Sequence, residues 1–160
     1  MESETASGGL ENRLIGVFEE GHRGPLVFII GGIHGNEKAG VKALKYLIKM
    51  LEVEHITNEA FRFRGRLIAF KGNLQALRKG KRYINRDLNR MFRKELLEDL
   101  LKQEVRTGEE KELIEIIDLI KNSIADYHPE RIFVLDLHTT TASGGIFTIV
   151  NDSPEAIQIG

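Results

Sequence analysis

The sequence contains no cysteine, almost no net charge and no long hydrophobic run, and each absence excludes a class of protein. Without cysteine, the chain cannot form disulfide bonds, cysteine-ligated metal centres or thiol nucleophiles. The 23 basic residues nearly balance the 24 acidic ones, which disfavours nucleic acid as a partner of the whole chain. No apolar segment approaches the ~20 residues of a membrane-spanning helix, and the polar segment Met1–Arg13 lacks the apolar core of a secretory signal. We therefore expect a cytoplasmic protein that binds neither nucleic acid nor a membrane.

The composition is typical of one compact domain. Apolar residues make up 41 % of the 160 residues and charged residues 29 %, which suffices for a packed core. The 16 glycines exceed the usual share of ~7 % and indicate several tight turns. We expect a flexible tail at residues 1–12 and a single domain over residues 13–160.

The hydrophobic pattern predicts strands that alternate with helices. Strands are expected at residues 14–18, 25–30, 66–70, 131–137 and 146–150, and helices at 37–51, 93–105 and 109–127. This alternation predicts an α/β fold in which helices flank a largely parallel sheet. Ligands of such folds bind at the carboxyl ends of the strands, so chemically active residues are expected there.

Two polar residues follow the second expected strand. His34 and Glu37 lie in the segment Gly31–Glu37, three positions apart, so their side chains can converge on one metal ion. The same segment is also compatible with a structural role, in which Gly31 and Gly32 end the strand and Glu37 favours the positive end of a helix.

A second histidine follows the strand expected at residues 131–137. His138 lies in the segment Asp136–Thr139, and a single histidine there is often only hydrogen-bonded. Because carboxyl ends of parallel strands meet at one edge of a sheet, however, His138 can join His34 and Glu37. A His-Glu-His set leaves a fourth position for water, as in catalytic zinc sites. The other histidines, His22, His55 and His128, are expected on the surface.

The segment 78–94 is rich in arginine and lysine and contains one acidic residue, Asp87. It is compatible with a solvated loop, with a phosphate-binding patch, or with recognition of a carboxylate by an arginine and Asn89. Asp87 could alternatively accept a hydrogen bond from a metal-ligating imidazole. The spacing does not choose among these alternatives.

Three motifs together resemble the succinylglutamate desuccinylase/aspartoacylase family of zinc carboxypeptidase-like amidohydrolases. The motifs are His34-Gly-Asn-Glu37, Arg82-Tyr-Ile-Asn-Arg-Asp87-Leu-Asn89-Arg90 and Asp136-Leu-His138-Thr. They occur in the order of the family, and the resemblance extends from about residue 26 to residue 150. It implies a mixed, largely parallel sheet of the zinc carboxypeptidase type over residues 13–160.

The resemblance also implies roles for individual residues. His34, Glu37 and His138 match the ligands of one zinc ion per chain. Asp87 matches the acid that hydrogen-bonds a ligating histidine, and Arg82 matches the arginine that polarises the carbonyl group under attack.

Asn89 and Arg90 match the pair that grips the carboxylate of the substrate. The implied substrates are small N-acyl acidic amino acids, such as N-acetylaspartate and N-succinylglutamate, and the implied reaction is hydrolysis of the amide bond by a zinc-activated water.

The chain departs from the family pattern in its general base. The family uses a glutamate several tens of residues beyond the third ligand, where this chain offers only Glu155, in what is expected to be the first turn of a helix. We therefore expect residues 13–160 to be the amino-terminal part of a longer catalytic domain, with the base beyond residue 160. Such a part-domain would leave sheet surface uncovered and could form homo-oligomers.

Two other functions are compatible with the same residues. A metallocarboxypeptidase would use a similar Asp-Leu-Asn-Arg motif to bind the terminal carboxylate of a peptide. A non-catalytic zinc- or polyanion-binding protein would use the basic segment 78–94, although this segment lacks interleaved aromatic residues.

Overall fold

Four strands form one mixed sheet in the computed structural model, which describes residues 13–103, 106, 108–139 and 148–149. Their order across the sheet is β1-β3-β2-β4, and their bounds are Leu14–Glu19 for β1, Leu26–Gly31 for β2, Arg66–Lys71 for β3 and Ile132–Leu137 for β4. β2 pairs in parallel with both β3 and β4, whereas β1 pairs antiparallel with β3. The predicted α/β fold with a largely parallel sheet is thereby confirmed.

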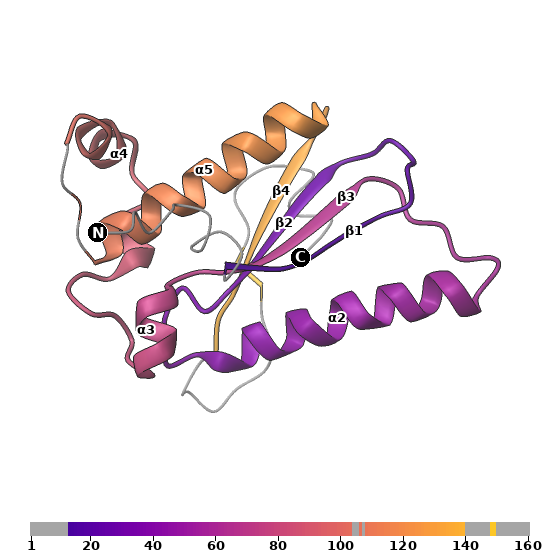
Figure 1. Cartoon of the computed structure of the whole chain (residues 1–160), viewed down its shortest axis with the longest axis horizontal. Helices are drawn as coiled ribbons and strands as arrows, with labels where there is room; N and C mark the ends of the chain where they lie inside the picture. Colours follow the sequence, from indigo (N-terminus) through magenta and orange to yellow (C-terminus); the bar gives the residue numbers. More distant parts are fainter. Residues whose placement is uncertain (1–12, 104–105, 107, 140–147, 150–160) are drawn as a thin grey trace, which may run out of the picture.

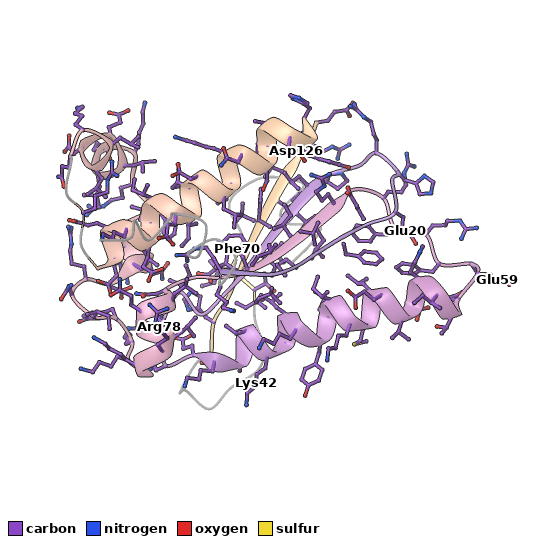
Figure 2. All side chains as sticks on the ribbon, viewed as in Figure 1. Glu20, Lys42, Glu59, Phe70, Arg78 and Asp126 are labelled. Atoms are coloured by element: carbon purple, nitrogen blue, oxygen red, sulfur yellow. The ribbon has the colours of Figure 1, made fainter. Side chains whose placement is uncertain are left out.

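Helices cover the two faces of this sheet. They are α2 (Lys38–Thr57), α3 (Leu74–Lys79), the 3-10 helix η1 (Leu88–Arg90), α4 (Lys94–Leu101) and α5 (Glu109–Tyr127). Figure 1 shows α2 and α5 on opposite sides of the sheet, with α3 and α4 near the start of α5. On the outer side of α2, the exposed Lys42 points away from the strands (Figure 2).

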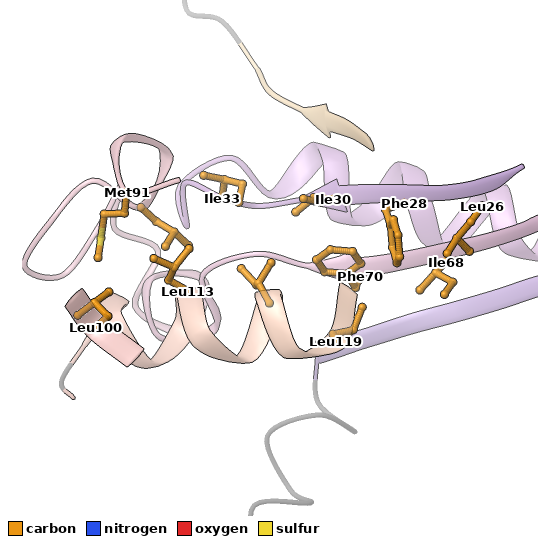
Figure 3. Close-up of a cluster of buried hydrophobic side chains, with 12 residues drawn as sticks. Leu26, Phe28, Ile30, Ile33, Ile68, Phe70, Met91, Leu100, Leu113 and Leu119 are labelled. Atoms are coloured by element: carbon orange, nitrogen blue, oxygen red, sulfur yellow. The ribbon is translucent and has the colours of Figure 1, made fainter. Parts of the chain in front are cut away.

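Alternation along the strands divides the buried residues into two clusters, one on each face of the sheet. On the α5 face, Phe28 and Phe70 pack with Leu113 and Ile116, and Figure 3 shows this cluster between the sheet and α5. On the α2 face, the cluster contains Ile29, Leu44, Ile48, Leu67 and Ala69. Removal of these apolar surfaces from water stabilises the layered arrangement.

The topology of the sheet has a switch point at β2. The connection from β2 to β3 contains α2, whereas the connection from β3 to β4 contains α5. β3 and β4 lie on opposite sides of β2, and the helices that lead to them lie on opposite faces of the sheet (Figure 1). Open α/β sheets bind ligands at such switch points.

The predicted element bounds are partly wrong. α2 starts at Lys38 and continues to Thr57, six residues beyond the predicted end, and α4 covers Lys94–Leu101 in place of 93–105. The structure also contains α3, which the hydrophobic pattern does not predict; its first turn is capped by the Asn73 side chain, and it ends at Gly80 with a positive φ of 61°. The predicted tail at 1–12 and most of the predicted strand at 146–150 lie outside the described residues. Within the described part of the chain, no helix has the length and apolar character needed to cross a membrane.

Candidate metal centre

His34 and Glu37 form a compact buried pair directly after β2. His34 Nδ1 lies 2.9 Å from Glu37 Oε1, and the two residues are only 2 % and 7 % exposed. Between them, Gly35 packs so closely on α3 that a Cβ atom there would overlap the backbone of Ala76. Glycine at this position therefore allows the segment with the two polar residues to approach α3.

His138 reaches the same point from the end of β4. In the parallel register, Gly31 of β2 lies opposite Leu137 of β4, so the residues that follow both strands meet at one edge. His138 Nδ1 lies 3.2 Å from Glu37 Oε2, and the amide of Thr139 donates to the same oxygen at 2.7 Å. The predicted meeting of His34, Glu37 and His138 is therefore present in the structure.

The three side chains offer a donor set that fits zinc. One ligand atom from each residue can be chosen so that all three lie within 4.8 Å of one another. Two imidazole nitrogens and one carboxylate oxygen are ligands that Zn²⁺ accepts, and three protein ligands leave a coordination position for water. His34 and Glu37 are buried whereas His138 is partly exposed, so the cluster has one side open to solvent.

Both imidazoles turn the same nitrogen, Nδ1, toward Glu37. Their other nitrogens contact acids, since His34 Nε2 lies 2.9 Å from Asp87 Oδ1 and His138 Nε2 lies 2.6 Å from Asp136 Oδ2. A carboxylate that holds a proton on Nε2 orients the ring, so that Nδ1 would offer its electron pair to a metal ion that replaces the Nδ1 proton. This pairing of each ligand with an acid is the observation in the structure that points most directly to a metal.

Asp87 was assigned to this contact through the family resemblance, whereas the role of Asp136 was missed. The available signal was its spacing, because residues two positions apart on a strand point to the same side. Asp136 therefore lies beside His138 when the latter follows β4 directly.

The carboxylates of the site have shifted pKa values. Burial acts to raise the pKa of Glu37, but the hydrogen bonds from the Thr139 amide and His34 outweigh it and lower the pKa. Asp87 follows the same rule, with His34 and Arg82 opposing the effect of burial and lowering its pKa. At Asp136, burial prevails over the contact with His138 and raises the pKa. Glu37 and Asp87 are thus held in the charged form that ligation and imidazole orientation require.

Arg82 lies at the rim of the cluster. Its guanidinium nitrogens are 3.5 Å from Glu37 Oε1 and 3.6 Å from Asp87 Oδ2, and its side chain is 52 % exposed. Its backbone carbonyl also accepts a hydrogen bond from the Gly35 amide at 3.1 Å. An exposed guanidinium beside the ligands is positioned to bind an anionic group that enters from solvent.

Asn89 and Arg90 lie on η1, immediately after Asp87. Both are exposed, and within the described part of the chain no hydrogen bond or ion pair joins their side chains to the cluster. The backbone amide of Asn89 donates to Asp87 Oδ1 at 3.1 Å, which caps η1. His22, His55 and His128 are exposed, as predicted, and His55 Nδ1 contacts Glu20 Oε1 at 2.5 Å.

Comparison with known proteins decides which family this site belongs to. Residues 23–158 match the model of the succinylglutamate desuccinylase/aspartoacylase catalytic domain. The chain belongs to this family. The family assignment covers the cluster and both segments that carry its ligands.

Individual relatives carry the two names of the family. The chain is 37 % identical over 131 residues to a probable aspartoacylase of Acaryochloris marina, covering 80 % of this chain and 39 % of the relative. It is 44 % identical over 66 residues to a succinylglutamate desuccinylase of Yersinia pseudotuberculosis, covering 41 % of this chain and 18 % of the relative. The chain thus spans less than half the length of these relatives.

Solved structures agree with the family assignment. The succinylglutamate desuccinylase of Chromobacterium violaceum superposes with a TM-score of 0.54 and 26 % identity, over 72 % of this chain and 33 % of that chain. The enzyme of the same name from Vibrio cholerae gives a TM-score of 0.56 at 21 % identity, over 76 % of this chain and 32 % of that chain, and supports the fold.

Proposed function

We propose that residues 13–160 supply the zinc site of a hydrolase that cleaves the amide bond of N-acyl acidic amino acids. The observation that carries the proposal is the convergence of two Nδ1 atoms on Glu37, with Asp87 and Asp136 behind the two rings. His34, Glu37 and His138 would hold one zinc ion per chain. Membership of a family whose relatives are named aspartoacylase and succinylglutamate desuccinylase supports the substrate class.

Zinc in such a site would supply a Lewis acid that lowers the pKa of bound water to about 7 and polarises a carbonyl group. The chain's own residues prepare the site for this chemistry. Asp87 and Asp136 hold the ligating rings in one orientation, and the buried carboxylate of Glu37 remains charged. These contacts preorganise the site before the substrate arrives.

Arg82 would stabilise the negative charge that develops on the carbonyl oxygen of the amide. Its guanidinium lies at the open side of the cluster and carries a permanent positive charge. Donors that are already in place when the charge appears need no reorganisation, and such electrostatic stabilisation is often the largest contribution to catalysis.

Asn89 and Arg90 would bind the far carboxylate of the substrate. Both side chains are exposed on η1, directly after Asp87, and an arginine forms two parallel hydrogen bonds with a carboxylate. Holding that end of the substrate would keep its amide at the cluster and reduce the entropy cost of the reaction. Among the described residues no further carboxylate contacts the cluster, so the general base stays unassigned.

Metal content tests the centre of the proposal. The purified chain should bind about one zinc ion, and His34→Ala and His138→Ala should each lose most of it. His22→Ala removes an exposed histidine away from the cluster and should bind zinc like the wild type. A folded wild-type chain that takes up no zinc would contradict the proposal.

A comparison of three substrates tests the reaction. Zinc-loaded protein should bind N-acetyl-L-aspartate or N-succinyl-L-glutamate in preference to a short peptide. Hydrolysis should be slow, by about 10²–10⁴-fold, because no general base contacts the cluster among the described residues. Arg82→Ala should lower the remaining hydrolysis more than binding. Preference for the peptide would instead favour a metallocarboxypeptidase. Salt-sensitive binding of an oligonucleotide that persists after chelation would favour a polyanion-binding protein.

A further inference from the structure

We propose that Glu109 is a positioning residue that fixes the loop between Arg82 and Asp87, and thereby places both side chains at the cluster. The geometric part of this inference stands on the structure alone, whereas its catalytic meaning rests on the proposed function. Glu109 is the first residue of α5 and is only 2 % exposed.

The carboxylate of Glu109 gathers four donors. Oε1 accepts hydrogen bonds from the Ile84 amide at 2.6 Å and from Asn73 Nδ2 at 3.0 Å. Oε2 accepts from the amides of Asn85 and Arg86 at 3.1 and 3.3 Å. Three consecutive backbone amides of one loop thus point at a single side chain.

The loop that Glu109 holds has both of its ends at the metal cluster. At one end, the Arg82 carbonyl accepts from the Gly35 amide, next to His34. At the other end, Asp87 Oδ1 contacts His34 Nε2 at 2.9 Å. Because Ile84–Arg86 lie between these two points, Glu109 fixes the middle of the segment that presents the arginine and the acid.

The charge of Glu109 is balanced by hydrogen bonds and, among the described residues, not by an ion pair. No salt bridge involves Glu109 in the described part of the chain, and burial alone would raise the pKa of its carboxyl group. The hydrogen bonds from Ile84, Asn73 and Asn85 outweigh burial and lower that pKa. A buried carboxylate costs free energy unless it accepts hydrogen bonds. The charged Glu109 therefore favours the loop conformation that directs the three amides at it.

A favourable interaction with the helix dipole of α5 does not explain why an acid is buried at position 109. The first turn of α5 contains two further acids, Glu110 and Glu112, which also favour the positive end of the helix. Glu112 contacts a different part of the chain, since it accepts from the Gln75 amide and pairs with Arg13. It therefore offers a matched control, a second buried carboxylate of the same helix that does not touch the loop.

Glu109→Gln is the informative variant. Whichever way the glutamine amide is turned, an NH₂ group replaces one of the two oxygens and faces donors, so two of the four hydrogen bonds are lost. Glu112→Gln should lower the free energy of unfolding to a similar extent and leave the loop in place.

The test combines amide hydrogen exchange with ligand binding. In Glu109→Gln, exchange should accelerate about tenfold or more at Ile84, or at both Asn85 and Arg86, according to which oxygen the NH₂ group replaces. Glu112→Gln should not accelerate exchange at any of these three amides. Zinc-loaded Glu109→Gln should bind N-acetyl-L-aspartate about tenfold more weakly than Glu112→Gln, because Arg82 is no longer held at the site.

Selective exchange together with weakened binding would support the inference. Equal acceleration in both variants, or unchanged N-acetyl-L-aspartate binding despite accelerated exchange at the loop amides that lose their bond, would overturn it. If the wild-type chain does not bind N-acetyl-L-aspartate, the proposed substrate fails, and the exchange comparison still decides whether Glu109 orders the loop.

Discussion

At the scale of single residues, Glu37 is the point on which the site converges. Its two oxygens contact His34 and His138, and one of them also accepts from the Thr139 amide. Arg82 approaches the same carboxylate from the solvent side. Each imidazole also contacts an acid on the side away from Glu37, so Asp87 and Asp136 help to fix the orientation of the two proposed histidine ligands.

We expect Asp87→Asn and Asp136→Asn to weaken zinc binding about 10- to 100-fold each, because the neutral amide holds the ligating ring less firmly and makes it less basic. The measurement is a zinc titration against a competing chelator, with circular dichroism to confirm folding. Asp118→Asn, an exposed position on α5, is the control and should bind zinc like the wild type. Unchanged zinc affinity in Asp136→Asn would show that its contact with His138 has no part in ligation.

At the scale of secondary-structure elements, α5 anchors the start of β1 and the end of β3 through one buried arginine. Arg13 is fully buried, pairs with Glu112 and Glu115 of α5 at 2.5 and 2.6 Å, and donates to the carbonyls of Lys71 and Gly72. These contacts join segments about 60 and 100 residues apart in the chain. Arg13 therefore fixes the position of α5 relative to the end of β3.

Arg13→Met should lower the free energy of unfolding by about 3–5 kcal/mol, because it leaves the buried carboxylate of Glu112 without its partner. Urea unfolding measures this change. Lys94→Met is the control, since it breaks an exposed pair with Glu98 on α4 and should cost no more than about 1 kcal/mol. Equal losses in the two variants would mean that burial adds nothing to the Arg13 pair.

The elements that could be predicted from the sequence are those with a long and regular pattern. The bounds predicted for α5, 109–127, coincide with the structure, because five apolar residues recur at helical spacing over about three turns, residues 113–124. α3 has six residues, fewer than two turns, so its pattern is too short to be distinguished from the loop around it. The end of α2 was placed too early because its last turns are mostly exposed and carry no apolar stripe.

The site shows the same limit. His34, Glu37 and His138 could be found because each directly follows a recognisable strand, and the family motifs identified Arg82 and Asp87. Glu109 could not be found in this way, because its partners are backbone amides of Ile84, Asn85 and Arg86. Backbone amides are present in every non-proline residue, so only the folded structure shows that three of them converge on one acid.

At the scale of the whole molecule, the proposed ligands come from two distant parts of the chain. His34 and Glu37 follow β2, whereas His138 follows β4, 101 residues beyond Glu37. A metal ion bound by all three would therefore connect the segments that follow β2 and β4, two neighbouring strands of the sheet. A metal ion that binds the folded chain and not the unfolded chain stabilises the folded chain against unfolding.

Zinc should raise the free energy of unfolding by about 2.7 kcal/mol when its free concentration is 100 times the dissociation constant. Thermal or urea unfolding with buffered zinc, and again with a chelator, measures the difference. His138→Ala should remove the effect, because two ligands from one segment no longer connect the strands. A zinc effect of equal size in His138→Ala would place the bound ion elsewhere.

The parallel pairing of β2 with β4 also dictates the order in which the centre can be completed. A chain that has emerged as far as β3 contains two of the three ligands next to each other, yet it holds them on the edge of an unfinished sheet. We expect His138 to join the other two residues late in folding, because the pairing of β4 with β2 closes a loop of about 100 residues. Metal uptake during refolding would then report the docking of β4.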